Sequence, residues 1–310
     1  MLHFPESGDV ILVVGPDKRR LQVDSVFLKK ASKYFAAMLG PNFSEGQNLG
    51  VGEPKEVSMP EDSSDALEII CNNVHLRLDA VPDHLNPIQV FDIATAADKF
   101  GCVVSLEHAT ALWLNPKDLT DILDLRHPMA AAYILDNAQA FSEITLRMMF
   151  CHKDSYLPLA DESKDLVEFV PSKVFYLLAE ERSQKYVDLQ DIIFCGIARG
   201  GDSYPKCTCA YTSTHTSAYA RLIKDRKLSP SRAREITISE IIEKLVVMED
   251  PVPPKGWTEC DYWWHGGSSR RSSLEYGLKE LRKKPGLCID CIRPSTSGAK
   301  ATCRIEHQKR

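Results

Sequence analysis

The pattern of apolar positions in the first 115 residues predicts short strands followed by helices. Three runs rich in β-branched or alternating apolar residues predict strands, at 9–15, at 21–26 and at 55–59. Apolar residues at helical spacing predict helices at 27–39, 65–75, 88–100 and 103–114. The expected order is two strands, a helix, a third strand and then several helices that pair as hairpins, without a regular alternation of strands and helices. This order is typical of an α+β fold with a short mixed sheet and not of a doubly wound sheet.

The pattern from residue 118 onwards predicts mainly helices. Residues 129–150 and 172–196 have apolar positions every three or four residues, and Pro128 stands where a first-turn proline is favourable. Residues 154–168 are more polar and predict a loop or a short helix. Residues 217–228 and 239–248 predict two short amphipathic helices, the second capped by Ser239. Segments this small have little apolar mass, so we expect a bound metal to contribute directly to their folding.

The amino-acid composition is consistent with the fold that the apolar pattern predicts. The chain has 310 residues, 44% of them hydrophobic and 26% charged, which is usual for a soluble protein and long enough for two domains. No apolar run approaches the roughly 20 residues of a membrane helix, and residues 1–10 do not resemble a signal peptide. We therefore expect a cytoplasmic or nuclear protein, without a membrane partner, divided into segments 1–115, 116–205 and 206–310.

Charge is distributed unevenly along the chain. Residues 1–205 carry 18 Lys and Arg against 31 Asp and Glu, a net −13, whereas residues 206–310 carry 20 against 12, a net +8. The basic residues of the tail that could contact phosphates are Arg270, Arg271, Lys283, Lys284, Arg304, Lys309 and Arg310. No basic block is long, and acidic residues are interleaved, so a solvated basic face is favoured and nucleic acid is not the expected partner.

Several strings between residues 7 and 115 resemble the BTB/POZ domain. They are SGDVILVVG, LQVDSVFLKKASKYFAAML, FSEG and VSMPEDSSDALEII, followed by NNVHLRLDAVP, ATAADKFGC and Trp113. The last three are similar to the version of the domain found in fungal proteins. The resemblance implies a BTB/POZ core that binds other proteins, with a homodimer and a cullin-type ubiquitin-ligase scaffold or a transcriptional complex as possible partners. Many BTB domains have a histidine where Val23-Asp24 stands here.

The first 115 residues contain no constellation that indicates catalysis, and we expect the protein not to be an enzyme. The carboxylates Asp9, Asp24 and Asp98 lie near the ends of expected strands or helices, where strand-end pairing, capping or a surface position explains each better than acid–base chemistry. We expect the two cysteines of this region, Cys71 and Cys102, to be packed in the core. No H-E-x-x-H, G-x-S-x-G or phosphate-binding glycine loop occurs in the chain.

Cysteine and histidine spacing near the end of the chain indicates a metal site. Cys288 and Cys291 form a C-x2-C pair, and Cys303 and His307 follow in CRIEH, which gives C-x2-C-x11-C-x3-H. Both pairs can direct two ligands at one ion, and three cysteines with one histidine suit tetrahedral zinc. The alternative is a tail with free thiols, which would be exposed to oxidation. The stretches GLCIDC and CRIEH also resemble the C-terminal ends of several fungal BTB proteins.

A second and looser group could hold another structural zinc ion. Cys207 and Cys209 form a C-x-C pair, and Cys260 and His265 occur together in ECDYWWH. More than 50 residues separate the two halves, and C-x-C is a poorer chelating pair than C-x2-C. The order of the groups along the chain also permits ligands to be exchanged between the two sites, so their grouping stays open.

Overall fold

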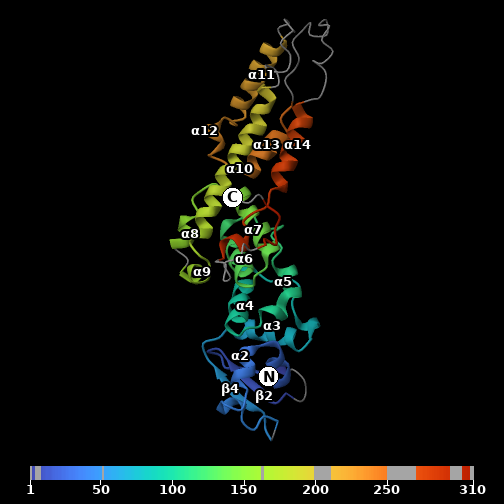
Figure 1. Ribbon diagram of the computed structural model, residues 1–310, viewed down its shortest axis with the longest axis vertical. Coiled ribbons are helices and arrows are strands. Elements are labelled where there is room, and N and C mark those ends of the chain that lie inside the picture. Colours follow the sequence, from blue (N-terminus) through green and yellow to red (C-terminus); the bar gives the residue numbers. More distant parts are fainter. Residues whose placement is uncertain are drawn as a thin grey trace. The chain divides into compact units, whose positions relative to one another are not determined.

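The computed structural model describes residues 2–3, 8–50, 52–161, 164–198, 211–249, 270–293 and 302–307. The chain forms two compact units (Figure 1). The first unit comprises Met1–Leu119, Leu123–Ile144 and Lys164–Pro171, and the second comprises Thr120–Ile122, Thr145–Ser163 and Ser172–Arg310. The expected segment 116–205 thus contributes residues to both units. The three-part division of the chain stays a prediction.

A mixed sheet of four strands lies in the first unit. Its strands are β1 (Leu2–His3), β2 (Val10–Val14), β3 (Arg19–Val23) and β4 (Lys55–Met59). Their order is β1-β3-β2-β4, with β2 antiparallel to β3 and parallel to β4, and β1 parallel to β3. The side chains of Val10, Leu12 and Val14 are fully buried, as expected for this β-branched run. The predicted α+β class with a mixed sheet is confirmed.

Helices complete the first unit. They are α1 (Ser25–Ala31), α2 (Lys33–Met38), α3 (Ser64–Val74), α4 (Pro87–Lys99), α5 (Glu107–Trp113), most of α6 (Ile122–Ile134), the start of α7 (Ala138–Cys151) and α9 (Lys164–Phe169). Single 3₁₀ turns form η1 (Ser44–Gly46), η2 (Leu78–Ala80) and η3 (Val103–Leu106). The expected helix at 103–114 therefore starts as a 3₁₀ turn.

Two boundaries near the start of the first unit differ from the sequence prediction. The second strand ends at Val23, because the side chain of Asp24 caps α1 by accepting a hydrogen bond from the Val26 amide. The predicted helix 27–39 is two helices. Ser32 has an extended backbone, and its hydroxyl accepts from the Phe35 amide while donating to the Phe100 carbonyl. One buried serine therefore starts α2 and ties it to the end of α4.

The helix predicted over residues 129–150 is wrong in its bounds. Pro128 lies inside α6 and not in a first turn. A break at Asp136, whose φ is +55°, separates α6 from α7. The side chain of Asn137 then accepts from the Ala140 amide, which starts α7. Met148 and Met149 of α7 are fully buried and therefore pack in the interior.

Helices and the turns and loops between them make up the part of the second unit that the structure describes, and residues 302–307 are not helical. After the end of α7 come α8 (Leu157–Asp161), α10 (Lys173–Ala198), α11 (Tyr211–Asp225), α12 (Pro230–Ala233), α13 (Ile238–Val246), α14 (Arg270–Lys283) and α15 (Ile289–Ile292). The long helix α10 packs against both α11 and α14 (Figure 1). Within the described residues, no helix is both long and apolar enough to span a membrane.

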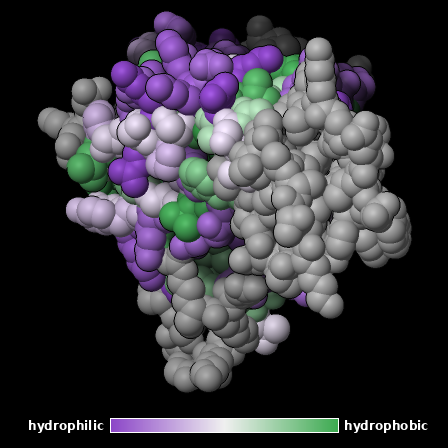
Figure 2. Space-filling view, turned by 90° about the horizontal axis from the view of Figure 1, so that it is seen from above, coloured by the Kyte–Doolittle hydropathy of each residue, from purple (hydrophilic) through white to green (hydrophobic). Residues whose placement is uncertain are grey.

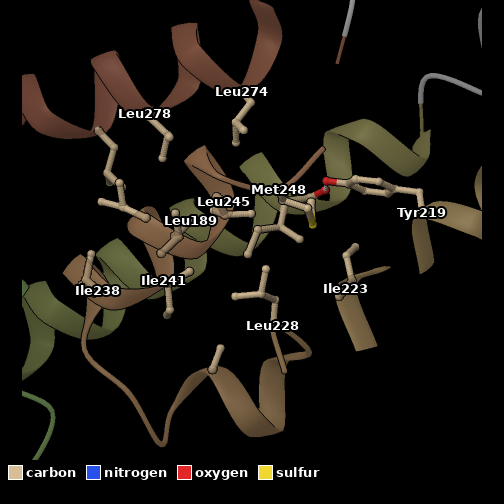
Figure 3. Packing of buried hydrophobic residues seen from close by; sticks show 14 residues of the cluster. Leu189, Tyr219, Ile223, Leu228, Ile238, Ile241, Leu245, Met248, Leu274 and Leu278 are labelled. Atoms are coloured by element: carbon tan, nitrogen blue, oxygen red, sulfur yellow. Dashed lines mark hydrogen bonds between the residues drawn. The ribbon is translucent and has the colours of Figure 1, made fainter. Parts of the chain in front are cut away.

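The second unit has a sizeable hydrophobic core, which corrects the expectation that its segments lack apolar mass. Figure 3 shows side chains from α10, α11, α13 and α14 meeting in one cluster. Leu189, Ile241 and Leu245 are fully buried there, and Leu274 and Leu278 reach it from α14. Burial of these apolar side chains stabilises the second unit through the hydrophobic effect.

The cap of α13 also differs from the prediction. Thr237, and not Ser239, is the N-cap residue. Its hydroxyl accepts from the Glu240 amide, and the Glu240 carboxylate accepts from the Thr237 amide at 2.7 Å, which completes a capping box. Starting the helix at Ile238 lets Ile238, Ile241 and Leu245 share its buried face.

Candidate metal centre

The segment after α14 brings the first two candidate ligands to the second unit. Cys288 is the N-cap residue of α15, and Cys291 lies within that single turn, where its amide donates to the Cys288 carbonyl at 3.2 Å. Leu287, Ile289 and Ile292 are buried around them. A tight turn between buried apolar residues therefore fixes the positions of the two cysteines of the C-x2-C pair.

Polar contacts fasten this turn to helices far away in the sequence. The Leu287 amide donates to the Thr145 hydroxyl of α7 at 2.9 Å, in a buried hydrogen bond. From α10, the Lys185 amino group donates to the Pro285 carbonyl at 3.3 Å, and that of Lys173 donates to the Cys291 carbonyl at 3.5 Å. Lys185 is only 2% exposed, and this burial lowers its pKa. The C-x2-C turn is thus part of the second unit and not an independent tail.

Four candidate ligand atoms converge at this turn. The sulfur atoms of Cys288, Cys291 and Cys303 and a ring nitrogen of His307 all lie within 4.8 Å of one another. Cys291 Sγ is 3.5 Å from Cys303 Sγ and 3.4 Å from His307 Nε2.

These separations can be compared with the edges of a zinc tetrahedron. Zinc–sulfur bonds of about 2.3 Å imply edges of roughly 3.7 Å between ligand atoms. The two closest separations are near that length, so the four residues could together bind a metal ion. The sequence spacing had predicted this group of four.

No protein-family model, curated protein or solved structure matches this chain. The metal centre is therefore supported by its own geometry.

The thiols of the cluster have unequal acidities. Burial raises the pKa of Cys288, and burial together with hydrogen bonding to Cys303 raises that of Cys291 to about 12. The pKa of Cys303 is lowered, chiefly by its hydrogen bond with His307. Because thiols bind metals as thiolates, uptake of a metal by these cysteines must release protons.

An ion pair next to the ligands joins the two halves of the site. Asp290, between Cys288 and Cys291, accepts from the backbone amide of Arg304 at 2.8 Å and from its Nη2 at 2.7 Å. Arg304 Nε adds a further hydrogen bond at 3.0 Å, and this pairing lowers the pKa of Asp290. Sequence spacing did not identify this pair, because charge alone does not reveal a contact across 14 residues.

The second expected ligand group cannot be compared with the structure. Cys207, Cys209, Cys260 and His265 all lie outside the described residues. Within the described residues, the group of four at 288–307 is the candidate metal cluster that is found.

Candidate residues of the first unit have structural partners. Cys71 and Cys102 are fully buried, as expected. The Asp9 carboxylate accepts from the amide and hydroxyl of Ser25 at 2.7 and 2.8 Å, at the start of α1. The Asp24 cap and this contact confirm structural roles for these two carboxylates, and Asp98 is exposed, which agrees with the expected surface position.

Proposed function

We propose that this protein is a non-catalytic protein-interaction module that carries a structural zinc ion on Cys288, Cys291, Cys303 and His307. The observation that carries the zinc site is the convergence of these four ligand atoms within 4.8 Å. Three sulfur ligands and one nitrogen ligand are the donor set that structural zinc prefers.

A structural role follows from the number of ligands. Catalytic zinc keeps one coordination position for water or substrate, whereas four protein ligands complete the tetrahedron. The C-x2-C turn is also hydrogen-bonded to α7 and α10. A zinc ion here would fasten residues 302–307 to the C-x2-C turn and so to the rest of the second unit.

The interaction role is supported by the resemblance of residues 8–115 to BTB/POZ domains. The first unit combines a mixed sheet with helices, and α1 exposes the neighbouring apolar side chains of Val26 and Phe27. BTB/POZ modules bind proteins, so a second copy of the chain, a cullin-type scaffold or a transcriptional complex are the proposed partners, in the cytoplasm or nucleus.

Metal content tests the zinc site. Protein purified without a histidine tag should contain one zinc ion per chain at this site, measured by elemental mass spectrometry. Cys303→Ser and His307→Ala should each lose it, and so should Cys288→Ser.

Cys151→Ser is the matched control, since Cys151 belongs to the same unit but lies outside the cluster. If a further ion occupies Cys207, Cys209, Cys260 and His265, it should survive all three ligand variants. Identical zinc content in the wild type and Cys303→Ser would contradict the proposal.

The interaction role is tested separately. Light scattering after size exclusion should give the mass of a dimer, or a pull-down with a purified cullin should retain the chain. A strict monomer that does not bind cullin would count against both forms of the interaction role, without affecting the zinc site.

The alternative of a nucleic-acid-associated regulator receives less support. In the described residues, several tail cations are paired with carboxylates of the chain: Arg271 with Glu275, Lys283 with Glu280, Lys284 with Asp188 and Arg304 with Asp290. In Figure 2, the residues of this face that are coloured by hydropathy are mainly hydrophilic, with some hydrophobic residues among them. Retention on DNA that weakens steeply with salt would revive this alternative.

A further inference from the structure

The two ligand pairs of the metal centre come from separate segments. Cys288 and Cys291 belong to the turn at α15, whereas Cys303 and His307 belong to residues 302–307. Asp290 lies between the first two ligands in the sequence, and Arg304 directly follows the third. A contact between Asp290 and Arg304 therefore holds the two segments together at the point where the ligands must meet.

This contact has more than one hydrogen bond. The Arg304 side chain donates to both carboxylate oxygens of Asp290, through Nη2 to Oδ1 at 2.7 Å and through Nε at 3.0 and 3.3 Å. Its backbone amide donates to Oδ2 at 2.8 Å. The Asp290 side chain is only 14% exposed, so water screens this pair less than an ordinary surface pair. The contact fixes both the direction of the Arg304 side chain and the path of the backbone next to Cys303.

We propose that Asp290 and Arg304 are the positioning pair that assembles this centre before the metal arrives and sets its affinity for zinc. This inference rests on the proposed zinc site. Residues that orient metal ligands commonly change metal affinity by about 10- to 100-fold when they are replaced.

Charge gives the pair a second effect on affinity. Three thiolates, one neutral imidazole and Zn²⁺ carry a net charge of −1. The Cys288 sulfur lies 4.0 Å from Asp290 Oδ2, so an unpaired carboxylate at this place would repel the thiolate. The Arg304 guanidinium neutralises that carboxylate. Removing Arg304 alone should therefore weaken zinc binding more than replacing both partners by neutral residues.

The test measures zinc affinity of the full chain by competition with a chromogenic chelator. Arg304→Gln should weaken zinc binding by about 10- to 100-fold. The double variant Asp290→Asn with Arg304→Gln should bind more tightly than Arg304→Gln. Arg304→Lys, which keeps the charge but loses the planar fork, should lie between Arg304→Gln and the wild type. The matched control is Arg232→Gln, which removes an Arg–carboxylate pair of the same unit at Glu235. It should leave the affinity unchanged.

A second readout separates positioning from a general loss of stability. At saturating Co²⁺, Arg304→Gln should keep the tetrahedral absorption bands of the wild type, because all four ligands remain. The thermal midpoint of its metal-free form should match that of metal-free Arg232→Gln. If Arg304→Gln binds zinc within threefold of the wild type, the positioning role is wrong and the zinc site stands. If the wild type binds no metal at all, both proposals are wrong.

Discussion

The backbone amide of Leu287 donates a hydrogen bond to the hydroxyl of Thr145, 142 residues earlier in the chain. Both residues are buried, and Leu287 is the residue directly before the ligand Cys288. Helix α7 thus holds one end of the candidate metal centre through the hydroxyl oxygen of Thr145.

Thr145→Val should loosen this end of the centre. Valine has nearly the shape of threonine but no acceptor, so the buried Leu287 amide loses its partner, at a cost of about 1–3 kcal/mol. Faster amide hydrogen exchange in residues 284–293 should report the loss, together with weaker zinc binding. Thr145→Ser keeps the hydroxyl and is the control. Equal exchange in the valine and serine variants would show that the hydrogen bond has no such role.

His75 should make the stability of the first unit depend on pH. Its Nε2 accepts from the Asp24 amide at 3.0 Å and its Nδ1 is 2.8 Å from the Cys71 carbonyl, an arrangement that requires the neutral ring. Burial lowers the pKa of His75, although the nearby Asp24 opposes the shift. The unfolded chain therefore binds this proton at a higher pH than the folded chain. Stability is fully present above the unfolded pKa of about 6.5 and is lost as the pH falls towards the lowered folded pKa.

Urea denaturation at a series of pH values checks this dependence. In His75→Gln the loss of stability between neutral pH and the lowered pKa should shrink relative to the wild type. His84→Gln replaces an exposed histidine of the same unit and should retain the full dependence. Parallel curves for the wild type and His75→Gln would refute the assignment.

Ser32→Ala should destabilise the first unit more than the loss of an ordinary helix cap. The variant removes the cap of α2 and also leaves the Phe100 carbonyl without the hydroxyl that donates to it. We expect a loss of about 1–3 kcal/mol in the free energy of unfolding. Ser63→Ala removes the cap of α3 only, through a 3.3 Å contact with the Ala66 amide, and should cost less. Chemical denaturation of both variants measures the difference.

Gly277→Ala should destabilise the second unit, although alanine is the better helix former by about 1 kcal/mol. A Cβ atom at this place in α14 would lie 2.9 Å from Cγ1 of Ile192 on α10. Overpacking of this kind costs about 1–3 kcal/mol. Adding Ile192→Ala should restore part of the loss, because it removes the atoms that clash. A thermal midpoint of Gly277→Ala at or above that of the wild type would contradict this account.

Sequence patterns predicted the features that depend on residues close together in the chain. The runs at β2 and β4 are β-branched or alternating and end at glycine or proline, so their bounds were nearly correct. The four clustered ligands followed from spacing alone. The capping box at Thr237 and Glu240 was also present in the sequence as T-x-x-E, although Ser239 was preferred as the cap.

Features that depend on distant partners were missed. The break at Ser32 is stabilised by the Phe100 carbonyl, 68 residues later in the chain. The hydrophobic core of the second unit joins α10 to α14, and neither helix alone indicates it. Likewise, no local pattern pairs Asp290 with Arg304 or Thr145 with Leu287. Charged and hydroxyl-bearing side chains occur along the whole chain. Which of them pair depends on the tertiary structure.

The distance in sequence between Thr145 and Leu287 also has a consequence for biosynthesis. At about 5–20 residues per second, a ribosome needs on the order of 10 s to add the residues between them. Throughout that interval the Thr145 hydroxyl of the nascent chain lacks the Leu287 amide, and the cysteines that follow have not yet been made. The contact between α7 and the C-x2-C turn can therefore form only late in the synthesis of each chain.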